Sequence, residues 1–125
     1  MGPTDRAQRL KIDTRLAIFE NINALQRQRK AAIQARDAAS VDAIQASIDV
    51  LHDQLDDLSF MSLETLEDSD ELRQTIAELR QATDTLEDEA DNIKTVADAL
   101  AKGARIIDQT VQIVEKLRQF VPFPV

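Results

Sequence analysis

The chain has 125 residues, of which 43% are hydrophobic and 30% are charged, and its net charge is -8. This hydrophobic content is too high for a disordered segment, and the length suits one domain with a buried core. Two glycines, three prolines and no cysteine, tryptophan or tyrosine leave too few turn residues for a β-sandwich or a loop-rich α/β enzyme. We therefore expect an all-α protein, built as an elongated helical hairpin or a three- to four-helix bundle with coiled-coil-like packing, in a single domain over residues 1–125.

The first predicted helix runs from about residue 5 to residue 36, with Thr4 as its N-cap. A broad stripe of apolar residues at helical spacing predicts which side of this helix faces the core. The stripe consists of Ile12, Leu16, Phe19, Ile22, Leu25, Ala32 and Ile33.

Charge is segregated along the chain. Residues 5–36 contain eight basic and three acidic residues, whereas residues 37–91 contain seventeen acidic residues and only two basic ones, Arg73 and Arg80. Opposite charges commonly flank the apolar contacts of a helical bundle. We therefore expect the basic first helix to lie against acidic neighbours of the same bundle.

The second predicted helix covers residues 41–66 and begins after Ser40 as its N-cap. Its apolar residues follow a strict heptad spacing on one narrow face, at Val41, Ile44, Ile48, Leu51, Leu55 and Leu58. This phase is lost between Ser59 and Ser69, which predicts a turn or a broken helix there. Ser69 is the expected N-cap of the next helix, because the acidic residues Asp70 and Glu71 suit a first helical turn.

The last part of the chain is predicted to form helices at 70–102 and 104–120, or one kinked helix over both ranges. One heptad phase runs from Leu72 to Val114 and continues across Gly103. After Gly103 a second apolar row joins the first, so the apolar face becomes much wider. Such a face needs more than one neighbour. Either Gly103 kinks or reverses the chain and packs the final segment into the bundle, or this segment is an interface with a second copy, another protein or a membrane surface.

No motif in the sequence predicts catalysis or a cofactor. Asp49 and His52 have the acid-to-histidine spacing of di-iron bundles, but His52 is the only histidine and no second pair exists. No serine lies in a nucleophile elbow, and the two glycines are too isolated for a phosphate-binding loop. We expect no enzyme, no metal site and no cofactor, and we interpret His52 as an exposed helix residue.

The sequence therefore predicts a cytoplasmic, non-enzymatic protein–protein interaction module, such as an adaptor, chaperone, immunity-type inhibitor or assembly factor. The predicted partner is another protein or a second copy of the chain, and the long heptad favours a homodimer over a monomer. Nucleic acid is disfavoured by the acidic composition. The alternative is a membrane-active helical protein that exposes its C-terminal amphipathic helix. The partner-binding anchor is predicted at Ile106, Ile113, Leu117, Phe120 and Phe123.

Overall fold

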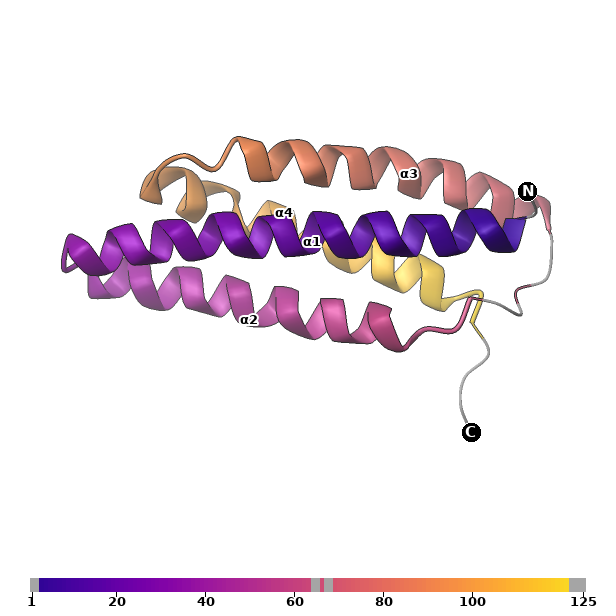
Figure 1. Cartoon of the computed structure of the whole chain (residues 1–125), viewed down its shortest axis with the longest axis horizontal. Helices are drawn as coiled ribbons and strands as arrows, with labels where there is room; N and C mark the ends of the chain where they lie inside the picture. Colours follow the sequence, from indigo (N-terminus) through magenta and orange to yellow (C-terminus); the bar gives the residue numbers. More distant parts are fainter. Residues whose placement is uncertain (1–2, 64–65, 67–68, 122–125) are drawn as a thin grey trace.

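The computed structural model describes residues 3–63, 66 and 69–121. These residues form four helices and no strand: α1 (Pro3–Gln34), α2 (Ala38–Phe60), α3 (Asp70–Asp91) and α4 (Val96–Arg118). Figure 1 shows the helices side by side with their axes along the longest dimension of the molecule. The all-α bundle expected from composition is confirmed.

Helix α1 is the central element of the bundle. It packs against α2, α3 and α4, and α4 packs in turn against α2 and α3. Within the described residues, α2 and α3 make no contact with each other. Helices α1 and α3 run in the same direction, and the tip of the α1–α2 hairpin extends beyond the α3–α4 turn (Figure 1).

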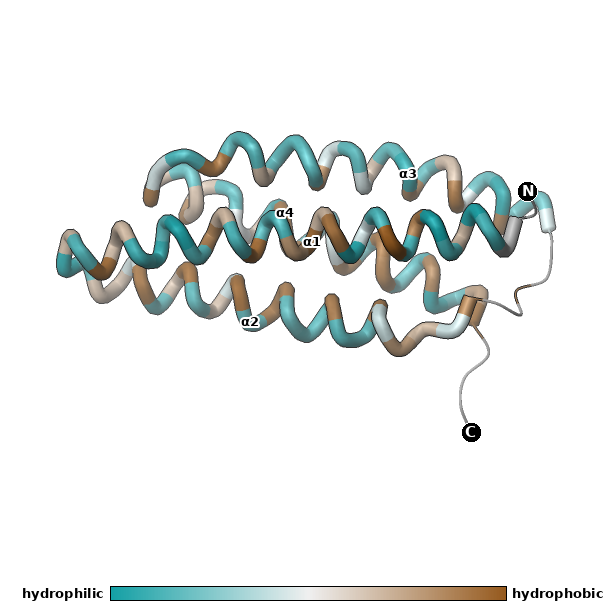
Figure 2. Tube along the Cα trace, in the orientation of Figure 1, coloured by the Kyte–Doolittle hydropathy of each residue, from teal (hydrophilic) through white to brown (hydrophobic). Residues whose placement is uncertain are grey.

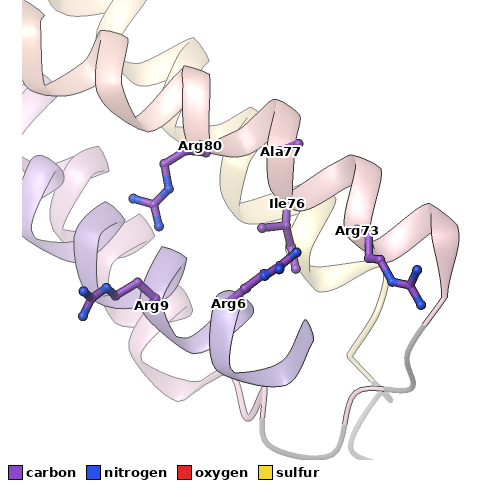
Figure 3. A pocket seen from close by; sticks show the side chains of 6 residues that line it. All are labelled: Arg6, Arg9, Arg73, Ile76, Ala77 and Arg80. Carbon is purple, nitrogen blue, oxygen red and sulfur yellow. The ribbon is translucent and has the colours of Figure 1, made fainter. Parts of the chain in front are cut away.

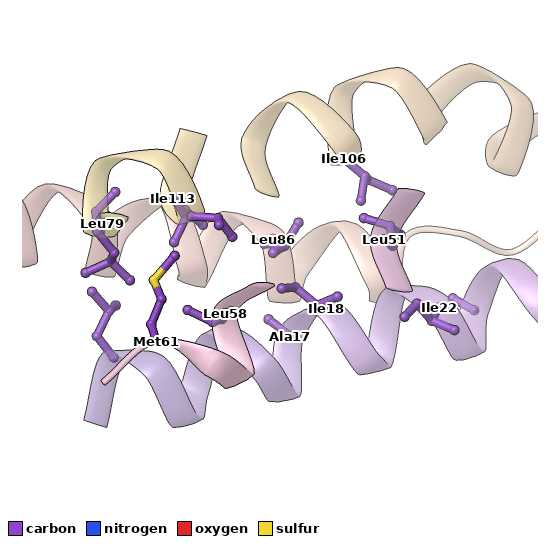
Figure 4. Close-up of a cluster of buried hydrophobic side chains, with 14 of the residues drawn as sticks. Ala17, Ile18, Ile22, Leu51, Leu58, Met61, Leu79, Leu86, Ile106 and Ile113 are labelled. Carbon is purple, nitrogen blue, oxygen red and sulfur yellow. The ribbon is translucent and has the colours of Figure 1, made fainter. Parts of the chain in front are cut away.

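The core is formed by aliphatic side chains from all four helices. Figure 4 shows Ile18 and Ile22 of α1 close to Leu51, Leu86 and Ile106 of the other helices. In Figure 2 hydrophobic and hydrophilic residues alternate along every helix, as expected where one side is buried and the other is solvated. The largest fully buried side chains are Leu10, Ile18, Ile22, Leu25, Ile44, Ile48, Leu51, Leu58, Leu63, Leu72, Leu86 and Ile106.

The predicted apolar face of α2 is correct, but its ends differ from the prediction. Ile44, Ile48, Leu51 and Leu58 are buried as the heptad requires. The helix begins three residues earlier than expected and ends at Phe60. Its N-cap is Asp37, whose carboxylate accepts hydrogen bonds from the Ser40 backbone N–H at 3.2 Å and from the Ser40 hydroxyl at 2.6 Å. Ser40 therefore lies inside the first turn instead of capping it.

The boundary between the last two helices was predicted wrongly. Helix α3 ends at Asp91, and α4 starts at Val96 and continues through Gly103 without a break. The predicted N-cap Ser69 of α3 is confirmed, since its side chain accepts a hydrogen bond from the Leu72 backbone N–H at 3.1 Å.

The heptad phase of α3 does not continue into α4. Ile93 is the last buried residue of that phase before α4, and the next three members, Ala97, Leu100 and Ala104, are exposed. Leu100 is 46% exposed, and the phase meets a buried residue again only at Val114. Because the chain reverses between the two helices, no geometric relation links their phases. The buried residues of α4 are instead Ala99, Gly103, Ile106, Thr110, Ile113, Val114 and Leu117.

Gly103 lies where α4 approaches α2. A Cβ atom at this position would be 2.9 Å from the Ser47 hydroxyl oxygen of α2. Glycine therefore serves close packing between two helices here, which is one of the two roles that a glycine inside a helix can have, the other being a kink.

The predicted core stripe of α1 is largely wrong. Ile22, Leu25 and Ala32 are buried, but Ile12, Leu16, Phe19 and Ile33 are between 49% and 60% exposed. The helix begins at Pro3, so Thr4 lies in its first turn and not at the N-cap, and it ends at Gln34. The stripe that actually faces the core comprises Ala7, Leu10, Thr14, Ala17, Ile18, Asn21, Ile22, Ala24, Leu25 and Ala32.

Two buried polar residues fix the position of α1 against α3. The hydroxyl groups of Thr14 and Thr83 lie 2.9 Å apart. Asn21 donates from Nδ2 to the backbone oxygens of Ala17, at 2.9 Å, and of Leu86, at 2.8 Å. Small and polar residues at these positions allow close approach of the two helices and satisfy the buried donors.

Candidate functional site

Three apolar side chains lie in a row on the outer face of α1. Ile12, Leu16 and Phe19 are 60%, 52% and 50% exposed, and their i, i+4, i+7 spacing aligns them on one side of the helix. We call these three residues the outer apolar ridge. Isolated exposed hydrophobic residues are common on proteins, but a contiguous set at helical spacing is typical of an interaction surface.

Basic side chains lie on both sides of the ridge. Arg9 precedes Ile12 by three positions and Arg15 follows it by three, so both are its neighbours on the helix surface, and both are exposed. Lys11 belongs to the same helix, but its ammonium group donates to the backbone oxygens of Ser59, at 3.1 Å, and Met61, at 2.6 Å.

The basic helix α1 packs against the acidic helices α2 and α3, as expected, but most of its cations form no ion pair with them. Ion pairs between the described helices connect basic residues of α4 with acidic residues of α2 and α3, as in Arg118 with Asp57 and Lys116 with Glu78. Helix α1 contributes an acid to such a pair, Asp13. No ion pair among the described residues involves the α1 cations Arg6, Arg9, Arg15, Arg27, Arg29, Lys30 or Arg36.

Beside the ridge, a groove between α1 and α3 collects four arginines. It has a volume of about 240 Å³. In Figure 3, Arg6 and Arg80 point into the space between the helices, whereas Arg9 and Arg73 lie at its margins and point outward. We call this site the arginine groove, and its lining residues are Arg6, Arg9, Arg73, Ile76, Ala77 and Arg80.

The two sides of the arginine groove differ in charge pairing. On α3, Arg80 forms an ion pair of 2.6 Å with Asp13, and Arg73 pairs at 3.5 Å with Asp70. On α1, Arg6 and Arg9 have no acidic partner within the described part of the chain. The α1 side is therefore the one that can accept an anion without breaking an existing pair.

Farther along the same α1–α3 contact, acidic residues are crowded together. Partial burial raises the pKa of Glu87, and the nearby carboxylates of Asp84, Glu20 and Asp13 raise it further, in that order, against the opposing effect of Arg80. The contact between these two helices thus has a basic end and an acidic segment, separated by the Asp13–Arg80 pair.

The structure buries three of the five residues of the C-terminal anchor predicted from the sequence. Ile106, Ile113 and Leu117 have no exposed surface, and Phe120 packs partly buried against the core. Phe123 lies outside the described residues. The wide apolar face of this segment is explained by the fold, because α4 contacts α1, α2 and α3 at once.

The remaining features raised by the sequence are the Asp49–His52 pair, a metal site and a membrane-crossing helix. His52 and Asp49 are exposed on α2, and Asp49 accepts a hydrogen bond of 2.8 Å from Gln45. Among the described residues, no group of three or more acidic or histidine side chains is placed to hold a metal ion. None of the described helices combines the length and apolarity needed to cross a membrane.

Sequence reasoning missed the outer apolar ridge because α1 carries two apolar stripes. The exposed stripe contains Ile12, Leu16 and Phe19, the last being the one aromatic residue of α1, and therefore looked like the core side. The signal for the correct side was weaker, since it consists of small and polar residues such as Ala7, Thr14 and Asn21 between the leucines and isoleucines. Residue volume alone predicts the wrong buried face for α1, because three helices pack closely against this helix and small residues allow that contact.

The chain matches no protein-family model, and comparisons with curated proteins and with solved structures found no match either.

Proposed function

We propose that this protein is a non-enzymatic protein–protein interaction module that binds a segment of another protein on the outer apolar ridge of α1. The observation that carries the proposal is the alignment of Ile12, Leu16 and Phe19, each at least half exposed, on a helix whose opposite side is fully buried. An amphipathic partner helix with apolar residues at the same i, i+4, i+7 spacing would fit the ridge.

The electrostatics favour a different protein over a second copy of this chain as the occupant. Pairing two α1 helices face to face in the same direction would bring Arg9 and Arg15 of both copies together. No described acid of the chain pairs with these residues. Like charges placed directly opposite one another destabilise an interface. A partner with acidic residues beside its apolar stripe would instead complement the surface.

The size of the ridge indicates a modest affinity from apolar contact alone. Burying the exposed half of each ridge side chain contributes about 1 kcal/mol, half of the value for a fully buried aliphatic residue. Three such contacts, about 3 kcal/mol in total, are worth less than the free energy of a millimolar complex even before association entropy is subtracted. Specific binding therefore requires polar contacts next to the ridge.

A random-peptide display selection tests the proposal. The bait is the full chain, and the counter-bait is the Leu16→Asp variant, with Phe19→Ser as a second variant. We expect enrichment of peptides with apolar residues at helical spacing whose binding is lost in both variants. Far-ultraviolet circular dichroism should show an unchanged helix content in the variants, because both positions are half exposed. No enrichment, or equal binding to the variants, would contradict the proposal.

Two further measurements distinguish other occupants of the ridge. Sedimentation velocity that shows a dimer of the wild-type chain and a monomer of Leu16→Asp would assign the ridge to a second copy. Flotation with vesicles of anionic lipid, lost in the same variant, would assign it to a membrane surface. We expect a monomer and no flotation, and either opposite result overturns the choice of a protein partner.

A further inference from the structure

We infer that the arginine groove is a carboxylate-binding site that selects acidic side chains of the partner segment docked on the outer apolar ridge. The inference rests on the proposed function and adds the chemistry of the partner. The groove adjoins the ridge, because Arg9 lines the groove and lies one helical turn before Ile12.

The composition of the groove is unusual for this chain. Residues 37–91 contain seventeen acidic residues and only two basic ones, Arg73 and Arg80. Both of these arginines line the groove, opposite Arg6 and Arg9 of the basic helix. The parallel packing of α1 and α3 creates this arrangement, since the Asp13–Arg80 pair joins residues 67 positions apart and the same offset places Arg6 opposite Arg73.

The ion pairs that the four arginines already form indicate which of them would contact the ligand. Arg80 is held by Asp13 at 2.6 Å and Arg73 pairs with Asp70 at 3.5 Å, so these two define the α3 wall. Arg6, which points into the groove, and Arg9, which lies at its margin on the side of the ridge, have no acidic partner among the described residues. A guanidinium group presents donors in a planar fork that matches both oxygens of a carboxylate, and such charge-assisted pairs are stronger than neutral hydrogen bonds.

The volume of the groove suits a single side chain of a docked segment. At about 240 Å³ it is smaller than the roughly 300–1,000 Å³ of typical small-molecule pockets. Ile76 and Ala77 form an apolar wall on α3 between the arginines. A glutamate or aspartate side chain with its methylene groups against this wall fits the size and the charge, and the rest of the segment continues onto the ridge.

The test uses the peptides enriched by the full chain and the same peptides with every Glu and Asp changed to Gln and Asn. Fluorescence anisotropy measures their binding to the wild-type chain, to the double variant Arg6→Gln/Arg9→Gln and to the matched control Arg27→Gln/Lys30→Gln. The control also removes two cations from the outer face of α1, about 27 Å along the helix from the groove.

We expect the acidic peptides to bind the wild-type chain about tenfold more tightly than their amide versions, and the groove variant to lose this preference. The control variant should keep it. Raising the salt concentration from about 50 to about 500 mM should reduce the preference, since rim charges are screened.

The outcomes separate this inference from the proposed function. If peptides are enriched but contain no excess of acidic residues, or if the groove variant and the control variant bind them equally, the carboxylate site is wrong and the docking ridge stands. If no peptide is enriched at all, the proposed function itself fails.

Discussion

Arg36 adopts a backbone conformation that favours glycine. Its φ angle is 57°, the single positive value among the described residues other than glycine. The α1 helix ends here in a Schellman arrangement, in which the Arg36 backbone N–H donates to Ile33 and the Asp37 N–H donates to Ala32, each at 3.0 Å. A residue with a Cβ atom in the left-handed region costs about 1 kcal/mol or more relative to glycine.

We therefore expect Arg36→Gly to stabilise the protein by up to about 1 kcal/mol. The matched control is Arg36→Ala, which removes the same side chain but keeps the steric conflict, and it should give no gain. Urea unfolding followed by circular dichroism measures both free energies of unfolding. An equal effect of the two substitutions would show that the arginine side chain, and not the backbone conformation, determines the stability at this position.

At the scale of elements, the turn between α3 and α4 determines how the second half of the chain folds. Its signal is a capping box at the start of α4, in which the Thr95 hydroxyl accepts a hydrogen bond from the Asp98 N–H at 3.0 Å. The Asp98 carboxylate in turn accepts from the backbone N–H groups of Lys94, at 3.0 Å, and Thr95, at 3.2 Å. This box ends the previous helix despite the heptad phase that runs through it.

The capping box predicts a pH dependence of stability. The hydrogen bond from the Lys94 backbone lowers the pKa of Asp98 below its ordinary value of 3.8 and outweighs desolvation, which raises it. The hydrogen bonds from Thr95 and the charge of Lys102 lower the pKa further. A lowered folded-state pKa stabilises the protein above 3.8, and this contribution disappears as the pH falls through the folded-state pKa.

Accordingly, Asp98→Asn should be less stable than the wild-type chain at pH 7, and the difference should shrink as the pH falls below 3.8. Thermal unfolding followed at several pH values measures this difference. Asp108→Asn is the control, because it removes an exposed carboxylate from the middle of the same helix. A pH-independent difference for Asp98→Asn would argue against the capping box as its cause.

At the scale of the whole molecule, the bundle turns the two stripes of α1 into two different surfaces. Helices α2, α3 and α4 all pack against α1, and together they cover the stripe that contains Leu10, Ile18 and Leu25. The remaining stripe, with the outer apolar ridge, faces away from the bundle. The surface that we propose for binding therefore belongs to a helix that has more apolar surface than the fold buries.

This assignment predicts a large loss of stability for a substitution at Ile18 and almost none for one at Leu16, two positions away. Ile18→Ala should destabilise the protein by about 2–5 kcal/mol, because Ile18 is fully buried. Leu16→Ala should change the stability by less than about 0.5 kcal/mol, because Leu16 is 52% exposed. Denaturant unfolding of the two variants checks the prediction, and the reverse order would restore the core stripe that the sequence suggested.

The sequence shows the residues of the arginine groove but not that they lie together. The cations of α1 and the two arginines of the acidic segment are visible in the sequence, but their meeting in one groove depends on the parallel register of α1 and α3. The C-terminal anchor had the widest apolar face and was the natural candidate. Its residues Ile106, Ile113 and Leu117 are buried because α4 packs against three helices, and a sequence does not state how many neighbours a helix has.

The sequence by itself determined the helical class, the core face of α2 and the cap at Ser69, because each follows from spacing and hydrogen bonding within a few residues. Only the tertiary structure decided which stripe of α1 is buried, where α3 ends and which cations remain unpaired. These properties depend on which helices pack together and at what distance. That choice is made by shape, since the small side chains of α1 and Gly103 of α4 allow the close contacts that larger residues would prevent.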